Sequence, residues 1–276
     1  MIKSTLKIDR SGLPLTPALF TTTQLEEYHY LIAVAAGFVA GIINTLAGSG
    51  SLFTLPVLLF LGLPAHHANG TNRVGILLQT LVGATTLYRK GNITTISDLR
   101  YILPAMAGSV TGALIAVEIP ESVLRLTIGV VMLVLLITLL FNYHSLMKET
   151  DAPVSEKKQN ISMLLMFIIG IYGGFIQMGV GIFLLSALLL YLQFTFKHAN
   201  ALKNSINFFL TIPAFIVFAI NGQVNWEMGA VMASGQMAGA WVAARYASEN
   251  QKANLWIRRL LVVMTLFSAM KLLNVI

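Results

Sequence analysis

Long continuous apolar segments dominate the pattern of hydrophobic and polar positions along this chain. Two examples are Val123–Phe141 and Ile161–Gly174. Segments that approach the ~20 residues needed to cross the hydrocarbon core of a bilayer predict membrane-spanning helices. The strands of a membrane β-barrel would instead alternate between apolar and polar residues, which excludes that architecture. The pattern therefore predicts an all-α, polytopic membrane protein.

The composition of the 276 residues agrees with a location in the lipid bilayer. Hydrophobic residues make up 56% of the chain and charged residues 11%, whereas a soluble domain carries roughly 25% charged residues. A soluble globular enzyme is therefore excluded. The net charge of +7 is typical of basic cytoplasmic loops in a membrane protein, so we expect no nucleic-acid partner. Because the chain has no cysteine, disulfides and thiolate metal sites are excluded, and we expect neither a cofactor nor a metal.

The chain repeats itself at a constant offset of 131 residues. This offset superposes Gly48 on Gly179 and Gly50 on Gly181. It also superposes two tripeptides on their counterparts, His67-Ala68-Asn69 on His198-Ala199-Asn200 and Met106-Ala107-Gly108 on Met237-Ala238-Gly239. Matches that keep the same order without a gap indicate that the chain consists of two duplicated halves.

Both halves predict the same series of elements: a helix, a glycine break, a short apolar arm and three longer spans. In the first half these lie at residues 30–47, 48–50, 52–61, 70–88, 99–117 and 123–143. In the second half they lie at 161–178, 179–181, 183–192, 199–220, 228–246 and 256–275. The predicted organisation is a polar N-terminal tail at 1–28, a first transmembrane repeat at 29–143, a cytoplasmic linker at 144–160 and a second transmembrane repeat at 161–276. The tail lacks the hydrophobic core of a cleavable signal peptide.

The short arms indicate that the two halves are inverted in the membrane. As a helix each arm covers only ~15 Å, whereas the hydrocarbon core is ~30 Å thick. Each hairpin therefore re-enters the membrane or breaks inside it, and three spans, an odd number, remain in each half. Inversion also places Arg89 and Lys90 on the same, cytoplasmic side as Arg258 and Arg259, as basic residues prefer. Both termini then lie outside, although the basic residues of the tail oppose this orientation.

Inverted repeats with broken helices are typical of secondary transporters, whose substrate binds near the midplane where the breaks meet. A gated anion channel is the alternative that is hardest to exclude. Two further readings are an intramembrane hydrolase that uses Ser49 or Ser51 with His66 or His67, and a purely structural or assembly role, which the cost of burying Arg73 and Lys203 disfavours. We expect no enzyme, because Ala47 stands where a G-x-S-G nucleophile motif has its first glycine.

Arg73 and Lys203 are the candidate substrate-binding cations. Each follows the repeated His-Ala-Asn at the start of a long apolar span, and the repeat pairs Asn72 with Lys203 and Arg73 with Asn204. An ionisable side chain inside a membrane bundle usually marks a site or a pathway. The sequence thus predicts a two-fold cationic cradle for a small anion. The alternative is that both side chains snorkel from a helix end to the interface.

The glycine breaks support the anion site, because glycine lets a ligand approach backbone N–H groups at the start of a helix. The residues expected there are Gly48, Ser49, Gly50, Gly179 and Gly181, with the amides of Asn69 and Asn200. We expect Asn44, Gln177 and Asn207 to line the same cavity. His67 and His198 are candidates for a gate or a proton carrier, or are interfacial loop histidines. No carboxylate falls in the middle of a predicted span, so a proton as coupling ion stays open.

These features resemble the TauE/SafE family of sulfite and organosulfonate exporters. The segments that carry the resemblance are Gly37–Gly41, Asn44–Ser51 with Pro56, Ala68–Arg73, Arg89–Ile93, Ala199–Asn204 and Gly235–Ala240. The resemblance covers about 28–276 and implies a bacterial inner-membrane exporter of a small sulfur-containing anion, driven by the proton gradient. Two departures matter: Gly-Ser-Gly-Ser replaces a run of glycines, and Asn44 and Gln177 stand where some relatives carry an acidic residue.

Overall fold

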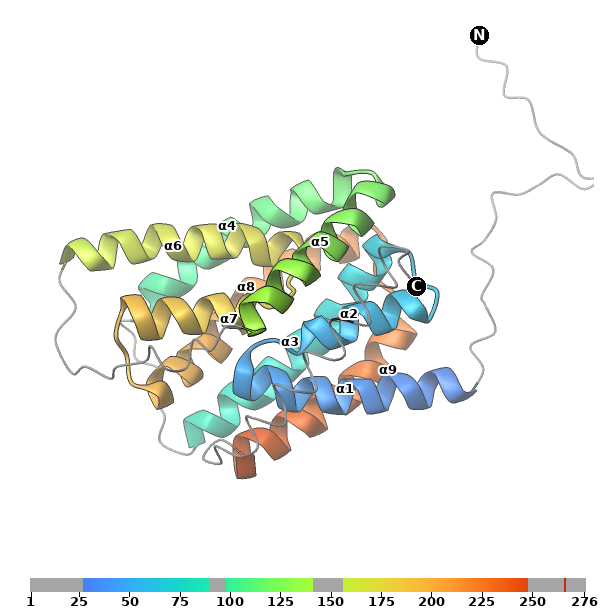
Figure 1. Ribbon diagram of the computed structural model, residues 1–276, viewed down its shortest axis with the longest axis horizontal. Helices are drawn as coiled ribbons and strands as arrows, with labels where there is room; N and C mark the ends of the chain where they lie inside the picture. The colour runs from blue at the N-terminus through green and yellow to red at the C-terminus, as the bar shows by residue number, and fades with distance from the viewer. Residues whose placement is uncertain (1–26, 90–97, 141–155, 248–265, 267–276) are drawn as a thin grey trace, which may run out of the picture.

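The computed structural model describes residues 27–89, 98–140, 156–247 and 266, and in these ranges the elements are all helical. Figure 1 shows the helices as an interlocked bundle. In chain order they are α1 (Glu27–Ala47), α2 (Ser51–Phe60), α3 (Ala65–Arg89), α4 (Leu99–Glu118), α5 (Glu121–Leu140), α6 (Glu156–Phe175), α7 (Val180–Ser186), the π-helical turn η3 (Ala187–Tyr191), α8 (Phe196–Ile220), α9 (Trp226–Val242) and the π-helical turn η4 (Ala243–Ala247).

Three of the described helices are long and apolar enough to cross a membrane, judged by length and composition. They comprise Tyr28–Leu46, Leu99–Glu118 and Phe196–Ile220. The short arms form as predicted, as α2 and as α7 with η3. The all-α prediction is therefore confirmed for the described part of the chain. The predicted tail, most of the linker and the last span at 256–275 lie outside the described residues.

The two halves fold into matching elements at the offset found in the sequence. α3 and α8 begin and end 131 residues apart. The first break forms at Gly48–Gly50 as predicted, whereas the second lies at residues 176–179, slightly before the predicted 179–181. Gly48 and Gly179 have φ angles of +76° and +67°. Glycine adopts this left-handed conformation without the steric cost that a β-carbon imposes. Each half thus begins with a helix and a short second helix, separated by a break that contains a glycine of positive φ.

The halves interlock through their first and fourth helices. α1 packs along α9 of the other half, and α6 packs along α4 in the same way. α3 and α8 pack against each other in the middle, α3 also against α9 and α8 also against α4 (Figure 1). Each of these contacts therefore has a counterpart at the same offset.

Glycines bring the paired helices into backbone contact. A β-carbon on Gly37 would collide with the main-chain oxygen of Met232, and one on Gly235 with that of Val34. α4 and α6 are in the same kind of backbone contact, because a β-carbon on Gly108 would collide with the main-chain oxygen of Phe167. Close approach at small residues is the usual basis of helix packing in membranes, where lipid removes the hydrophobic driving force.

α5 shows how the remaining helices divide between core and lipid. Leu124, Ile128, Met132 and Leu135 are fully buried and lie in the same apolar cluster as residues of α2. Their spacing of three to four residues places them on one face. Large apolar side chains of the opposite face are exposed, namely Leu126, Val130, Val134 and Ile137. An exposed apolar face of this kind suits contact with lipid chains.

Candidate functional site

α3 and α8, the two central helices, carry most of the buried polar side chains. α3 buries Asn69, Asn72, Arg73, Gln79 and Thr80. α8 buries Asn200, Lys203, Asn204, Asn207 and Thr211. This polarity explains why α3, with 25 residues, is not among the helices that qualify as spans by hydropathy. Polar groups at this density inside a bundle need partners, because unpaired polar atoms are costly to bury.

Arg73 is fully buried and reaches across to the end of α6. Its Nη1 donates to the main-chain oxygen of Gly173 at 3.1 Å and to Oε1 of Gln177 at 2.9 Å. Its Nη2 donates to the main-chain oxygen of Gly174 at 2.5 Å and, at 3.5 Å, to Asn69 Oδ1. The guanidinium carbon lies 4.5 Å from the centre of the Phe218 ring. Only its Nε lacks a hydrogen-bond partner.

Lys203 occupies the corresponding place in the other half. Its side chain is 1% exposed, and Nζ donates to the main-chain oxygens of Asn44 and Thr45, both at 3.0 Å. These oxygens belong to the last turn of α1, and that of Asn44 also accepts from the N–H of Gly48 at 2.9 Å. Lys203 therefore binds the end of the first helix of the opposite half, as Arg73 does at Gly173 and Gly174.

The two cations thus share one structural role. The C-terminal end of a helix carries a partial negative charge of about half an electron, which a cation stabilises. The snorkelling alternative is wrong for both residues, because both side chains are buried and bound to helix ends inside the bundle. Their recorded partners are all uncharged.

Gln177 connects Arg73 to α8. Its Nε2 donates to Asn207 Oδ1 and to Thr211 Oγ1, both at 2.9 Å, while its Oε1 accepts from Arg73. The backbone of Gln177 has a φ of +65°, a conformation that residues with a β-carbon rarely adopt. Such strain persists where the surrounding contacts fix the residue, and it is commonest at functional sites.

The two glycine breaks touch each other. A β-carbon on Gly48 would collide with the backbone of Gly181, and the reverse also holds. Ser51 Oγ donates to the main-chain oxygen of Gln177 at 3.0 Å and accepts from the N–H of Gly179 at 3.3 Å. Gly50 packs against the main-chain oxygen of Ala40, where a β-carbon would also collide. The breaks therefore cross in the structure, as the transporter hypothesis requires.

The predicted amides are present in this region but differ in how far they are satisfied. Asn69 Nδ2 donates to the main-chain oxygen of Phe175 at 2.7 Å, and Asn204 Nδ2 to that of Asn200 at 2.8 Å. Asn72 Oδ1 accepts from Thr54 Oγ1 at 2.6 Å. Besides Arg73 Nε, three buried polar atoms of the predicted site residues have no partner among the described residues: Asn72 Nδ2, Asn200 Oδ1 and Ser49 Oγ.

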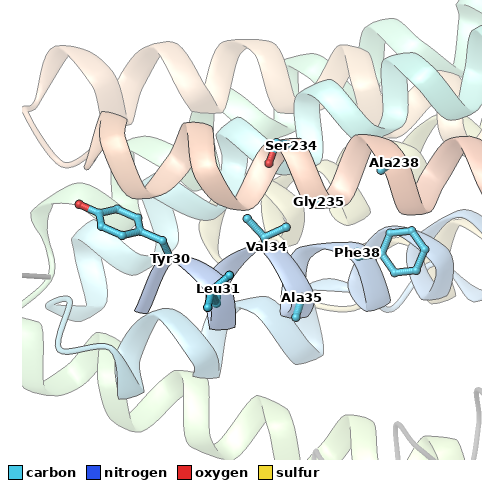
Figure 2. A pocket seen from close by; sticks show the side chains of 8 residues that line it. All are labelled: Tyr30, Leu31, Val34, Ala35, Phe38, Ser234, Gly235 and Ala238. Atoms are coloured by element: carbon cyan, nitrogen blue, oxygen red, sulfur yellow. The ribbon is translucent and has the colours of Figure 1, made fainter. Parts of the chain in front are cut away.

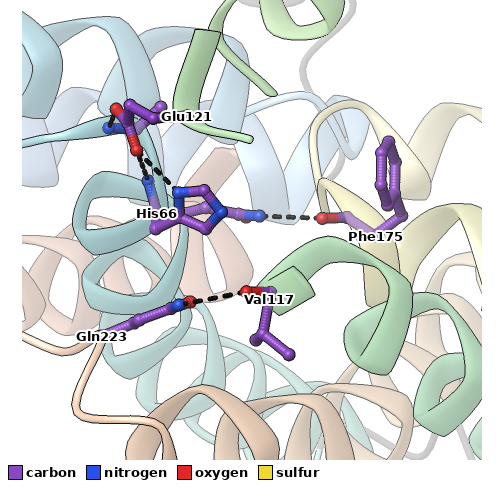
Figure 3. Close-up of polar contacts among 7 residues, drawn as sticks. His66, Val117, Glu121, Phe175 and Gln223 are labelled. Atoms are coloured by element: carbon purple, nitrogen blue, oxygen red, sulfur yellow. Dashed lines mark hydrogen bonds and ion pairs between the residues drawn. The ribbon is translucent and has the colours of Figure 1, made fainter. Parts of the chain in front are cut away.

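The two histidines proposed as a gate lie at helix starts. His198 Nε2 is 3.5 Å from Oδ2 of Asp98, at the start of α4. His67 is half-buried, and its neighbour His66 binds Glu121 at the start of α5, with Nδ1 and Oε2 2.6 Å apart (Figure 3). An ion pair between a histidine and an acidic residue was not predicted at either place.

The hydrolase alternative gains no support from the two serines. Ser49 Oγ has no hydrogen-bond partner, and Ser51 Oγ bonds to backbone groups of Gln177 and Gly179. In the part of the chain that the structure describes, neither hydroxyl is thus bonded to a histidine that could act as its base.

Gln79 and Gln236 are buried site candidates that the sequence reasoning missed. Both are 1% exposed, and both have side-chain atoms without a partner. The sequence feature that could have pointed to them is an uncharged amide near the middle of a predicted span. Gln79 lies in the span at 70–88 and Gln236 in the span at 228–246. Neither residue is charged, so neither stands out within an apolar span.

An apolar groove of about 750 Å³ lies elsewhere, between α1 and α9. Figure 2 shows its lining of Leu31, Val34, Phe38 and smaller residues, with Tyr30 at one end. None of the candidate polar residues lines it. The groove therefore does not form part of the polar site.

The family model for the sulfite exporter TauE/SafE matches residues 33–272. The chain belongs to the TauE/SafE family. The match spans both halves, so the crossed breaks and both cations of this TauE/SafE protein lie within it. Together with the apolar helices, family membership identifies a helical membrane protein.

Several curated relatives of this TauE/SafE protein are named as membrane transporters. The probable membrane transporter protein ORF9 of a Sinorhizobium species is 32% identical over 238 residues, which cover 86% of this chain and 90% of the relative. A probable membrane transporter protein of Haemophilus influenzae is 30% identical, with 87% and 93% covered. YfcA of Escherichia coli K12, named in the same way, is 28% identical, with 88% of each chain covered. No solved structure matches.

Proposed function

We propose that this protein is a secondary transporter that exports a small anion, sulfite or a related organosulfur anion, by alternating access. The observation that carries the proposal is the pair of buried cations, Arg73 and Lys203, which meet only uncharged partners. Asp98, the other charged residue that is buried in the described part, pairs with His198. Within the described residues, neither Arg73 nor Lys203 therefore has a carboxylate partner, and a substrate anion supplies the missing counter-charge.

The charge of the site fits a small anion. Two side chains contribute two positive charges, and the two helix ends that they bind offset about half a charge each. About one positive charge then remains at the crossing of the breaks. A larger organic cation or a neutral sugar gains nothing from such a site. The substrate-binding residues that we propose are Arg73, Lys203, Asn72, Asn204, Asn69, Asn200, Gly48, Ser49, Gly50, Gly179 and Gly181, with Asn44, Gln177 and Asn207 alongside.

The hydrogen bonds of the cations suggest how binding drives movement. Arg73 and Lys203 each tie a central helix of one half to the first helix of the other. An anion that accepts hydrogen bonds from these cations competes with the main-chain oxygens at the helix ends. Binding therefore weakens ties between the halves, and a bound ligand shifts the conformational equilibrium by its differential affinity for the two states.

The topology that we propose follows from the repeat. The halves are inverted, the short arms re-enter the membrane, and the protein lies in a bacterial inner membrane with both termini outside. The matching elements at a 131-residue offset and the reciprocal packing of α1 on α9 and α6 on α4 support this arrangement. Inverted halves give a transporter two related conformations that open to opposite sides.

In this proposal His67 and His198 are the residues that take part in proton coupling. Histidine titrates near neutral pH, and both residues lie at the starts of the two central helices, α3 and α8. A proton gradient would then drive export through these groups or through the protonation of the substrate itself.

Flux into proteoliposomes tests the proposal. The full chain is reconstituted, and uptake of sulfite, sulfate, thiosulfate, alkylsulfonates and carboxylates is measured with and without a pH gradient. We expect saturable flux of a sulfur-containing anion that the gradient accelerates. Flux that is not saturable and not coupled to a gradient would favour a gated channel, and no flux of any anion would contradict the proposal.

A further inference from the structure

Gln79 of α3 and Gln236 of α9 are buried amides on two helices that pack against each other; they are called the Gln79–Gln236 pair below. Gln79 Oε1 and both polar atoms of the Gln236 side chain have no hydrogen-bond partner. Each side chain is 1% exposed. Burying an amide without a partner is unfavourable, and lipid offers no water to relieve it. Native structures rarely keep such groups without a ligand or a water to bind.

The backbone of α3 makes room for these amides. A β-carbon on Gly75 would lie 2.5 Å from Gln236 Oε1 and 2.6 Å from its Nε2, so the side chain of Gln236 lies directly against this glycine. Gln79 follows Gly75 by four residues and therefore lies one turn further along the same face of α3. From the other side, Gly41 of α1 packs on the main-chain oxygen of Gln236. Gln236 thus lies against glycines of both α3 and α1.

The second half has no such amides. At the 131-residue offset, Gly75, Gln79 and Gln236 correspond to Ile206, Leu210 and Ala105. These three counterparts are fully buried and belong to one apolar cluster. The same helix interface therefore packs well without polar groups, so packing gives no reason for the amides in the first half.

Asn72 links the amide pair to the charged part of the site. It precedes Gln79 by seven residues, two helical turns, and so lies on the same face of α3. Its Nδ2 also lacks a partner, and the next residue is Arg73. Unpartnered polar atoms thus extend along α3 from the cation to the Gln79–Gln236 pair.

We infer that Gln79 and Gln236 bind a second, uncharged polar group of the substrate, a hydroxyl that both donates and accepts a hydrogen bond. This inference rests on the proposed function and narrows its substrate class to small anions that carry a hydroxyl away from the charged group. The hydroxyl donates its one hydrogen to Gln79 Oε1, and its oxygen accepts from Gln236 Nε2. A site built to bind a hydroxyl rejects an analogue that lacks it, because its own polar groups then stay unpaired.

Two probes that differ only at this position test the inference. In 2-hydroxyethanesulfonate a hydroxyl replaces the terminal methyl group of propane-1-sulfonate. We expect reconstituted full-length protein to transport the hydroxylated probe at least tenfold more efficiently, measured as the ratio of kcat/KM. Gln79→Leu with Gln236→Ala introduces the residues of the second half and should bring this ratio close to one, mainly by slowing the hydroxylated probe. Each single variant is measured as well, in case the double variant fails to insert.

Gln223→Leu is the matched control. Gln223 Nε2 donates to the main-chain oxygen of Val117 at 3.4 Å (Figure 3), and its Oε1 is also buried without a partner, but it lies between α8 and α9. This variant should keep the wild-type ratio. Equal transport of the two probes by the wild type, or an unchanged ratio in the Gln79 and Gln236 variants, would overturn the inference and leave the proposed transporter intact. Absence of flux for both probes together with every other anion would instead contradict the proposed function and the inference with it.

Discussion

Lys203 Nζ lies 3.0 Å from the main-chain oxygen of Asn44, at the end of a helix that belongs to the other half of the chain. Arg73 binds the end of α6 in the same manner through Gly174. At each break, a cation from the opposite half donates to main-chain oxygens at the end of the helix that precedes it. The cations therefore join the halves at the place where the proposed substrate binds.

Removal of the Lys203 ammonium should destabilise the protein. In Lys203→Met two main-chain oxygens, those of Asn44 and Thr45, lose a charged donor, which costs ~1.5–3 kcal/mol for a hydrogen bond to a charged group. The midpoint of thermal unfolding in detergent measures the effect. Lys197→Met is the control, because Lys197 is exposed in the first turn of the same helix. Equal midpoints for wild type and Lys203→Met would contradict the role assigned to the ammonium.

Arg73→Lys should impair transport although it keeps the charge. The guanidinium bridges the oxygens of Gly173, Gly174 and Gln177 with two nitrogens, and a lysine offers a single ammonium in place of this planar fork. We expect a loss of anion flux of at least tenfold with unchanged insertion, measured in proteoliposomes against Arg125→Lys on the exposed face of α5. Wild-type flux would mean that charge alone suffices at this position.

Gly181→Ala tests the contact between the breaks. The new β-carbon would collide with the backbone of Gly48, and a main chain cannot rotate away as a flexible side chain can. Overpacking of this kind costs ~1–3 kcal/mol, so a lower unfolding midpoint and lower flux are expected. Gly83→Ala is the control, because its β-carbon would lie 3.4 Å from the nearest atom, Asn204 Oδ1, an ordinary contact. A Gly181→Ala protein as stable as Gly83→Ala would show that the breaks do not touch.

Glu121 should contribute stability that depends on pH. It is the first residue of α5, ahead of the apolar run that starts at Val123. Burial raises the pKa of its carboxyl, but hydrogen bonds from the His66 side chain and from the main-chain N–H groups of Ala65 and His66 outweigh burial and hold the pKa below its ordinary 4.5. A lowered pKa means that the folded state favours the charged form, so the contribution is complete above pH 4.5 and disappears as pH falls through the lowered value.

The difference in unfolding midpoint between wild type and Glu121→Gln measures this contribution. We expect the wild type to be the more stable at pH 7 and the difference to shrink below pH 4.5. Glu118→Gln, at the exposed end of α4, should leave the midpoint unchanged. A difference that stays constant down to pH 3 would contradict the account of Glu121.

The sequence allowed the helices and both cations to be predicted, but not their partners. Glycine breaks and apolar runs are local signals, and a lysine or arginine inside such a run stands out. The partners of Lys203 are main-chain oxygens some 158 residues away, and every residue carries such an oxygen, so no residue type marks them. The role of Gln79 and Gln236 could not be predicted for a related reason. A single amide in a span is unusual only when its neighbours in the fold leave it without a hydrogen-bond partner.

The rate of anion export from proteoliposomes by Arg73→Ala and Lys203→Ala, with Arg125→Ala as the exposed control, tests the anion site most directly. The site proposed here predicts that both variants insert and fold but lose flux of the transported anion, while the control keeps the wild-type rate. Wild-type flux in both variants would contradict an anion site at the two buried cations.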